Sequence, residues 1–261
     1  MNDKELIPLV DLDGVVFRCG FSADAQIKKE YLEVEPMASE EAIKEALASV
    51  DYLSHALGNT KTVMEAVLDR YSPEYRAYLH AGGNYRYDVA TIKPYKGNRD
   101  RDHKPKYFDE IRQYLFDVWK AIPVESIESD DAIGIEQSSM PYGSSVIVTN
   151  DKDLRQIAGY HFNWTKPELG TEEVSPEEAD LMFYWQMLVG DTSDNIPGIW
   201  KIGPKTATKI IDECNGDLDR VKQSVIQCYT KQYGNDWQSA WNEIGTLLYI
   251  RRTEDGVCPL L

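Results

Sequence analysis

Cysteine is scarce in this chain of 261 residues. Its four cysteines, Cys19, Cys214, Cys228 and Cys258, lie far apart, and no C-x-x-C spacing occurs. Such a set is typical neither of a zinc site nor of the dense disulfide framework of a small secreted domain. We therefore expect four free thiols in a reducing compartment.

Long hydrophobic runs are also missing. No apolar stretch approaches the roughly 18 residues of a membrane helix, and the opening residues MNDKELIPLVDLDG lack a basic start followed by an apolar core of signal-peptide length. The sequence predicts a cytoplasmic protein with no membrane partner. Because 42% of the residues are hydrophobic, the chain can bury a sizeable core.

Positive charge is in short supply. There are 28 Lys and Arg against 44 Asp and Glu, a formal net charge of −16. Proteins that hold nucleic acid by neutralising phosphates are usually basic overall, so the total argues against a simple polyanion binder. However, residues 168–194 hold eight acids and no Lys or Arg, whereas residues 93–106 hold six basic residues against two acids. The average conceals an acidic surface and a basic one.

Short apolar strands alternate with amphipathic helices over residues 1–165. The pattern predicts strands at 6–17, 75–80, 122–125 and 145–149. It predicts helices at 39–57, at 107–121 and at 150–157, a further helix that follows residue 57 and ends near residue 70, and one for which Ser129 is the N-cap. This order predicts an α/β core with a mostly parallel sheet. Residues 166–261 read as mainly helical, with a strong helix start at 175–178. We expect the two parts to pack as one continuous unit.

Acidic residues cluster at four places, each at or just after an apolar segment. The carboxyl ends of parallel strands meet at one edge of a sheet, where such folds build their sites. Carboxylates in this number suit Mg²⁺ or Mn²⁺, and the lack of clustered His or Cys argues against zinc. Helix capping explains any single cluster equally well, but the repetition favours a metal site, in which two ions would act on a phosphodiester. The clusters are Asp11 with Asp13; Glu128, Asp130 and Asp131; Asp151 with Asp153; and Asp191 with Asp194.

One of these clusters has a second interpretation. Residues 11–17, DLDGVVF, match the opening motif of haloacid-dehalogenase-type phosphatases, whose first Asp is the nucleophile. Lys152 and the pair Asp191 and Asp194 can be assigned that family's later roles. The phosphatase interpretation leaves the acids at 128–131 and everything beyond residue 195 without a purpose.

Two basic segments are candidates for phosphate contact. Residues 195–211, NIPGIWKIGPKTATKII, place glycines before a Pro at the first turn of an amphipathic helix, as in helix-hairpin-helix DNA binders. Gly203 allows backbone N–H groups to approach a phosphate, with Lys201, Lys205 and Thr206 beside it. In residues 93–99, KPYKGNR, Tyr95 can stack on a base while Lys96 and Arg99 reach phosphate oxygens. Solvated lysines in ordinary turns are the alternative for both.

Five ordered motifs together resemble the 5'-nuclease superfamily of phage-type 5'-3' exonucleases, flap endonucleases and the 5'-nuclease domains of bacterial DNA polymerases. The likeness covers nearly the whole chain. Its motifs are Val10-Asp11 followed by Phe17-Arg18, YKGNR at 95–99, ESDDAIG at 128–134, TNDKDL at 149–154, and GDTSDNIPG at 190–198 with IGPKTA at 202–207.

The resemblance implies a PIN-like α/β fold with a carboxylate site for two or more Mg²⁺ ions, with Mn²⁺ as a substitute. It implies a short arch near residues 82–106 over that site, and a helix-hairpin-helix that holds duplex DNA, with K⁺ as a further ion. Lys96 and Arg99 would be catalytic, stabilising charge on the scissile phosphate. Tyr95, Lys201, Gly203, Lys205 and Thr206 would contact DNA. The expected metal ligands or their supporting acids are Asp11, Glu128, Asp130, Asp131, Asp151, Asp153, Asp191 and Asp194.

The chain departs from the family pattern at three places. Where many members carry an Asp before the YKGNR segment, residues 80–86 read HAGGNYR, and Asp88 is a poor substitute. Asp13 is an extra acid, which strand alternation would place on the same face as Asp11. The usual Gly-Ile-Gly turn reads Lys201-Ile202-Gly203.

The main hypothesis is a monomeric Mg²⁺-dependent 5'-3' nuclease of a bacterial or phage-infected cell, acting on DNA or RNA-DNA hybrid at a 5' end, flap or nick, with replication proteins as partners. The alternatives are the phosphatase with Asp11 as nucleophile and a DNA-junction binder whose metal site has decayed.

Overall fold

A six-stranded mixed sheet forms the centre of the computed structural model, which describes residues 3–100 and 103–256. The strand order is β3-β2-β1-β4-β5-β6, and all neighbours are parallel except β5 and β6. This confirms the expected mostly parallel α/β fold. The strands are β1 (Ile7–Asp11), β2 (Arg76–Gly82), β3 (Ile122–Glu125), β4 (Ser145–Val148), β5 (Gly159–Phe162) and β6 (Thr171–Val174).

Alternating side chains bury both faces of the sheet. Val10 and Val148 point into one core, which lies under α1, α3 and α5, while Leu9 and Ile147 point into another on the side of α6. Such two-sided burial explains why the central strands are apolar almost throughout. The first helices are α1 (Leu12–Val34), α2 (Glu40–Ser49), α3 (Leu53–Arg70), α4 (Arg86–Val89), α5 (Phe108–Asp117) and α6 (Ser129–Ser139).

A helical part follows the sheet and has its own core, centred on the fully buried Trp241 and Tyr229. It contains a small β7–β8 hairpin and short 3-10 turns in addition to the helices. The edge strand β6 carries the sheet to Val174, beyond the expected boundary at residue 165. The elements are α7 (Pro176–Val189), β7 (Gly190–Asp191), β8 (Ile196–Pro197), α8 (Pro204–Asp212), α9 (Leu218–Tyr233) and α10 (Trp237–Leu248), with 3-10 turns at Asp3–Glu5, Asp153–Gln156, Pro167–Leu169 and Gly234–Asp236.

Three sequence-based element predictions are wrong in detail. β1 ends at Asp11 rather than Phe17, because the Asp11 side chain accepts a hydrogen bond from the Asp13 amide and caps α1. The helix expected over 39–57 is broken after Ser49, and Gly58 lies inside α3. The helix expected at 150–157 is only a short 3-10 turn.

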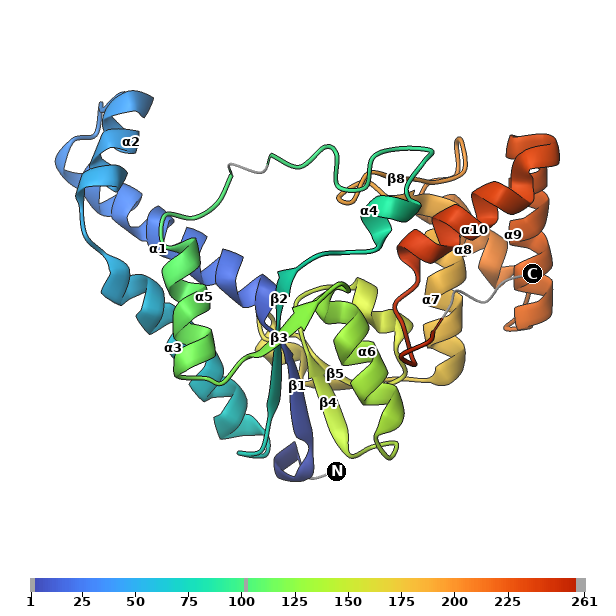
Figure 1. Cartoon of the computed structure of the whole chain (residues 1–261), viewed down its shortest axis with the longest axis horizontal. Helices are drawn as coiled ribbons and strands as arrows, with labels where there is room; N and C mark the ends of the chain where they lie inside the picture. Colours follow the sequence, from blue (N-terminus) through green and yellow to red (C-terminus); the bar gives the residue numbers. More distant parts are fainter. Residues whose placement is uncertain (1–2, 101–102, 257–261) are drawn as a thin grey trace.

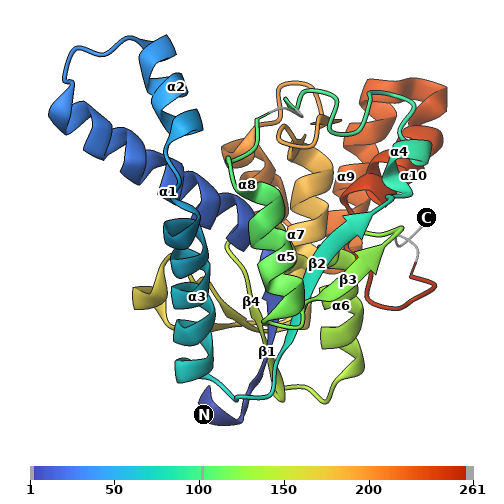
Figure 2. The ribbon, with the colours of Figure 1, turned by 60° about the vertical axis from the view of Figure 1, so that its left-hand side comes forward.

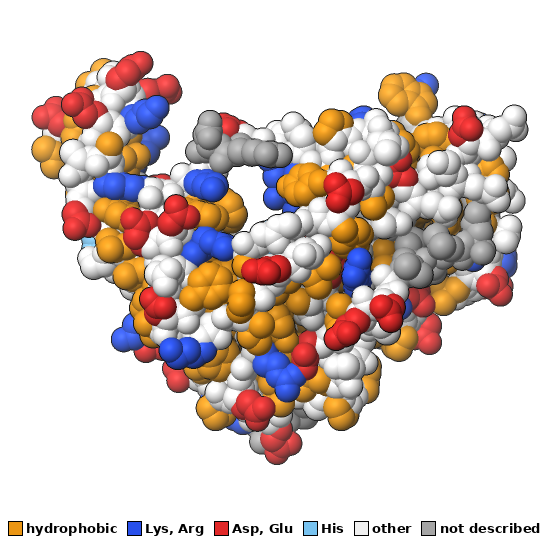
Figure 3. Space-filling model, viewed as in Figure 1, with side chains coloured by type: hydrophobic (Ala, Val, Ile, Leu, Met, Phe, Trp, Pro, Cys, Tyr) orange, Lys and Arg blue, Asp and Glu red, His pale blue; other side chains and the backbone are white. Residues whose placement is uncertain are grey.

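The molecule is hollowed on one side. Helix α2 and the outer part of α1 project as an arm, while α3 runs back from the arm beside the sheet (Figures 1 and 2). The segment that follows α4, up to residue 100, runs from the helical part towards the side of the arm. Figure 3 shows Lys and Arg side chains near the hollow between the arm and the helical part, and acids on the arm, beside the hollow and over the lower surface. No helix in the described ranges has the length and apolarity needed to cross a membrane. Cys258 lies outside the described residues, and the other three cysteines are free thiols.

Candidate metal centre and nucleic-acid interface

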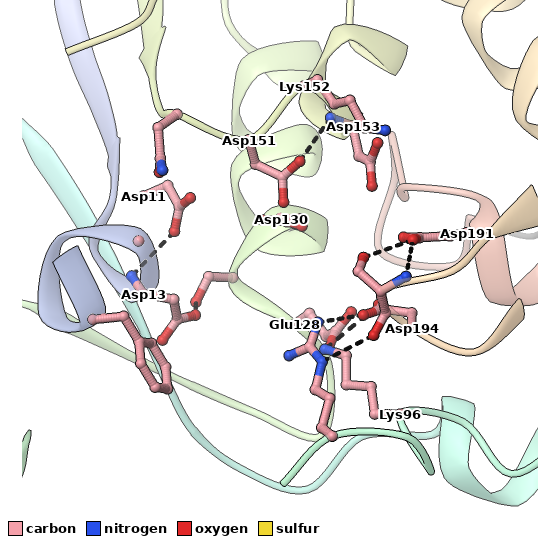
Figure 4. Close-up of a pocket in the computed structure, with 16 residues that line it drawn as sticks. Asp11, Asp13, Lys96, Glu128, Asp130, Asp151, Lys152, Asp153, Asp191 and Asp194 are labelled. Atoms are coloured by element: carbon pink, nitrogen blue, oxygen red, sulfur yellow. Dashed lines mark hydrogen bonds and ion pairs between the residues drawn. The ribbon is translucent and has the colours of Figure 1, made fainter. Parts of the chain in front are cut away.

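A cavity of about 540 Å³ lies at the carboxyl ends of β1 and β4, against the first turn of α6. It gathers acids from segments far apart in the chain, as Figure 4 shows. Two cations, Lys96 and Arg99, stand on one side of it. The lining acids are Asp11, Asp13, Glu128, Asp130, Asp151, Asp153, Asp191 and Asp194.

Asp11 and Asp13 reach the cavity from different elements. Asp11 ends β1, and its Oδ2 accepts a hydrogen bond of 2.8 Å from the Thr149 hydroxyl. Asp13 lies in the first turn of α1 and accepts a hydrogen bond of 2.7 Å from Ser129 Oγ. The two acids therefore share the cavity because the strand turns directly into a helix, not because they alternate along one strand. Ser129 is the first residue of α6, and Glu128 takes the N-cap position expected for it.

Asp131 does not belong to the cavity. Its side chain is fully buried and makes a bidentate ion pair with Arg86, at 2.5 and 2.9 Å. The same guanidinium donates to the carbonyl oxygens of Leu247 and Tyr249 in the helical part. We therefore remove Asp131 from the expected metal ligands. Arg86 was not among the predicted site residues, although it lies in the segment HAGGNYR, which lacks the acid of the family pattern.

Neither this segment nor the following α4 brings a carboxylate into the cavity. β2 ends at Gly82, Asp88 is exposed on α4, and neither lines the cavity. The place of a family acid is therefore unfilled on the β2 side, whereas Asp13 adds an acid on the α1 side.

Asp130 comes from the first turn of α6, and the other four acids come from two loops. Asp151 and Asp153 follow β4, and Asp153 donates its backbone N–H to Asp151 Oδ1 at 2.8 Å. Asp191 and Asp194 belong to the β7–β8 hairpin, where Asp191 Oδ1 accepts hydrogen bonds from the Ser193 amide and hydroxyl. These acids thus arrive on backbones already fixed by local hydrogen bonds.

Lys96 and Arg99 are paired with acids of the same cavity. Lys96 Nζ forms an ion pair with Glu128 and lies 3.7 Å from Asp194, while Arg99 pairs with Asp194. Lys96 adopts a φ of 53°, and its backbone N–H donates to the Asp194 carbonyl at 2.8 Å. A phosphate entering the cavity would therefore compete with carboxylates for these two cations.

Tyr95 does not stack on DNA in this arrangement. Its ring is buried in the core of the helical part, and its hydroxyl lies 2.8 Å from both Glu128 Oε2 and Asp194 Oδ2. The expectation that Tyr95 is an exposed stacking platform is wrong. The side chain instead holds two site acids in place.

Burial and mutual repulsion oppose the ionisation of several acids. Desolvation, followed by the neighbouring charge of Asp13, raises the pKa of Asp11 to about 7. Desolvation and the charge of Asp151 do the same for Asp153, whose pKa also rises to about 7. The pKa values of Asp130 and Asp151 are raised by the same causes. For Glu128, burial is outweighed by Lys96 and Arg86, which hold its pKa below the usual range.

The donor set fits hard divalent cations. Buried carboxylates with raised pKa values are sites where a cation would lower the free energy, and hard oxygen ligands suit Mg²⁺ and Mn²⁺. Asp153 Oδ1 is buried without a hydrogen-bond partner among the described residues. Among residues 3–100 and 103–256, no three Asp, Glu, His or Cys side chains lie close enough together to hold one ion in their present positions. Binding would therefore draw the acids inwards.

We expect Mg²⁺ to stabilise the protein more at about pH 8 than at about pH 5. Raised folded-state pKa values mean that the folded chain binds more protons than the unfolded one, so metal-free stability falls as pH rises from 3.8 towards 7. A bound cation offsets the charge of the ionised acids and so removes this fall in stability. Thermal unfolding with EDTA or Mg²⁺ at both pH values checks this, and Asp153→Asn should shrink the difference. An equal Mg²⁺ shift at both pH values would contradict the assignment.

The glycine turn lies outside the cavity, at the start of α8. Gly203 is the N-cap and Pro204 the first helical residue, and Lys201, Lys205 and Thr206 are all exposed. Lys201 adopts a φ of 62°, in the left-handed region that favours glycine, at the position where the family pattern has glycine. A lysine thus adopts here a backbone conformation that glycine adopts more readily.

The comparisons with known proteins agree on one group. A family model described as 5'-3' exonuclease, C-terminal SAM fold, matches residues 178–245. DNA polymerase I of Streptococcus pneumoniae is 25% identical over 240 residues, which are 85% of this chain and 25% of the relative. A 5'-3' exonuclease of Buchnera aphidicola is 29% identical over 152 residues, 51% of this chain and 47% of that protein. The chain thus spans about a quarter of the length of the polymerase relatives.

Solved structures with the same fold come from bacteriophage T5. A flap endonuclease in complex with DNA and metal ions has a TM-score of 0.50 at 15% identity, covering 93% of this chain and 94% of that one. A 5'-exonuclease with bound zinc has a TM-score of 0.51 at 15% identity, covering 93% and 95%. At such identity the likeness is one of fold.

Proposed function

Because the chain belongs to the 5'-nuclease superfamily, we propose that it is a Mg²⁺-dependent 5'-3' nuclease that hydrolyses phosphodiester bonds of DNA at a 5' end or flap. The observation that carries the proposal is the cavity in which acids from four separate segments face Lys96 and Arg99. Removal of primers or processing of replication ends, on DNA or RNA-DNA hybrid, is the role that suits such an activity. The likeness of residues 11–17 to phosphatases is then a local one.

The cavity acids would hold the metal ions. We propose Asp11, Glu128, Asp130, Asp151, Asp153, Asp191 and Asp194 as ligands or their supports, with Asp13 standing in for the acid missing after β2. When bound, two such ions supply an activated water and offset charge on the leaving oxygen. Mn²⁺ is an expected substitute, and K⁺ an expected ion of the turn before α8.

The chain's own cations would act on the scissile phosphate. The N–H groups of Lys96 and Arg99, which here pair with Glu128 and Asp194, would donate to non-bridging phosphate oxygens in place of those carboxylates. Donors placed in a partly buried site stabilise the charge that develops in the transition state. The products would carry 5'-phosphate and 3'-hydroxyl ends.

A direct assay tests the proposal. A 5'-labelled flap, a nicked duplex and a blunt duplex are incubated with Mg²⁺, and product lengths are resolved. Cleavage near the 5' end of the flap or nick is expected, and none with EDTA. Release of phosphate from small esters by both the wild type and Asp130→Asn, without cleavage of DNA, would favour the phosphatase instead.

A second candidate rests on the gap after β2. If the acid missing near Ala81 is not replaced by Asp13, the chain would bind DNA junctions without cutting them. Structure-selective binding with no cleavage in either Mg²⁺ or Mn²⁺ would identify this function.

Lys96→Ala should slow cleavage far more than it weakens binding. Removal of one donor to the transition state typically costs about 10²–10³ in rate, whereas ground-state contacts elsewhere hold the DNA. Single-turnover rates and DNA affinities measured on the same flap check this. Lys61→Ala, at an exposed pair on α3, is the control. Equal losses in rate and affinity would make Lys96 a positioning contact only.

Lys205→Ala should weaken duplex binding and lower the slope of log K against log salt by about one unit. The exposed ammonium stands in the first turn of α8, where backbone N–H groups also face outwards. Binding titrations at several salt concentrations measure the slope. An unchanged slope would remove this turn from the DNA interface, and Lys61→Ala again serves as the control.

A further inference from the structure

The turn before α8 presents a large apolar side chain to solvent. Trp200 is 78% exposed, among the most exposed large hydrophobic residues of the described chain. Single exposed apolar residues are common and need no explanation by themselves. This one, however, occupies the tip of the turn whose backbone and lysines are the candidate phosphate contacts.

The tip is rigidly held. The Ile202 amide donates to the Ile199 carbonyl at 3.0 Å, which makes Trp200 and Lys201 the two central residues of a tight turn. Ile199 and Ile202 pack into the core of the helical part, and the Trp200 amide donates to Gln232 Oε1 at 2.5 Å. The two isoleucines anchor the turn, so the indole is displayed outwards on a fixed backbone rather than on a loose loop.

Two lysines accompany the indole. Lys201 Nζ lies 6.0 Å from the centre of the Trp200 ring, and Lys205 is exposed in the first turn of α8. The turn also connects directly to the cavity, because the β7–β8 ladder pairs Asp191 with Ile196 just before it. A ligand that binds these lysines would be anionic. A long polyanion bound there would extend from the turn to the cavity.

We propose that Trp200 packs into the minor groove of duplex DNA held by the turn before α8, as an apolar contact independent of base sequence. The inference deepens the proposed function, on which it rests for its ligand. Phosphate contacts from Lys201, Lys205 and the α8 N-terminus would border the groove, and the indole between them would reach sugars and base edges. Apolar side chains used in this way partly unstack base steps and bend the duplex.

Salt dependence distinguishes this contact from its charged neighbours. Trp200→Ala should weaken binding of a flap duplex about tenfold, the loss of one aromatic contact with bases, while leaving the slope of log K against log salt unchanged. Lys201→Ala should instead lower that slope. Because the Trp200 backbone bond to Gln232 needs no indole, the variant should fold normally, which circular dichroism checks. Tyr142→Ala, a 60% exposed ring in the loop before β4, is the control.

Fluorescence provides a direct readout. The emission of Trp200 is obtained as the difference between the wild type and Trp200→Phe. A duplex should quench this emission, and a single strand of equal length should quench it much less. Normal duplex affinity of Trp200→Ala, or equal quenching by both nucleic acids, would overturn the inference. If the wild type cuts no substrate but Trp200→Ala still loses duplex affinity, the proposed nuclease fails and the Trp200 contact stands. If the wild type cleaves the flap and Trp200→Ala binds duplex normally, the nuclease stands and the Trp200 contact fails.

Discussion

Asp130→Asn is expected to abolish cleavage while making the metal-free protein more stable. Asp130 lines the cavity and is surrounded by Asp11 and Asp151, so that burial and like charge raise its pKa. Loss of a residue that only supports a metal ligand lowers activity or affinity by about 10–100-fold. Loss of a ligand itself should therefore lower the cleavage rate by more than about 100-fold. The neutral amide removes the charge repulsion that opposes folding at neutral pH.

Two measurements separate these effects. Flap cleavage in Mg²⁺ gives the rate, and thermal unfolding in EDTA at about pH 8 gives the stability, where each kcal/mol moves the midpoint of a chain of this size by about 2–4 °C. Asp109→Asn, an exposed acid on α5, should change neither. A destabilised but fully active Asp130→Asn would show that this carboxylate supports the fold and not the chemistry.

Arg86→Met should lower the free energy of unfolding by about 3–5 kcal/mol, because it strands a buried carboxylate. Asp131 is fully buried, and Arg86 supplies two of its hydrogen bonds. The substitution also frees the carbonyl oxygens of Leu247 and Tyr249 from their donors. Since these contacts tie α6 and α4 to the end of α10, the helical part should loosen from the sheet.

Urea unfolding of matched variants tests this. Arg155→Met breaks an exposed pair with Glu172 and should cost less than about 1 kcal/mol. The double variant Arg86→Met/Asp131→Leu should recover part of the loss, because it removes the unpaired charge. A loss for Arg86→Met no larger than that for Arg155→Met would show that the buried pair contributes little.

Most of the candidate site could be predicted without coordinates. Asp11, Asp151 and Asp153 follow apolar strands, and the parallel arrangement of β1 and β4 brings strand ends together whatever the details of packing. The turn before α8 was equally predictable, because Gly203 and Pro204 are local signals of a helix start. Helix ends were the weakest predictions, and the end of α2 at Ser49 is an example. Because α2 buries none of its residues, its sequence carries no clear pattern that marks where it ends.

The sequence by itself determined four of the six strands of the sheet, the acids near the strand ends and the basic segments, because these follow from local periodicity and residue chemistry. Helix α1 and the strands β5 and β6 were not predicted. Only the tertiary structure decided which side chain faces which surface. Neighbouring helical residues point about 100° apart, so Asp130 faces the cavity while Asp131 faces Arg86 and the core. Tyr95 was likewise turned inwards by Glu128 and Asp194, 33 and 99 residues away. Such contacts depend on how α6 and the hairpin rest against the sheet, which no local pattern specifies.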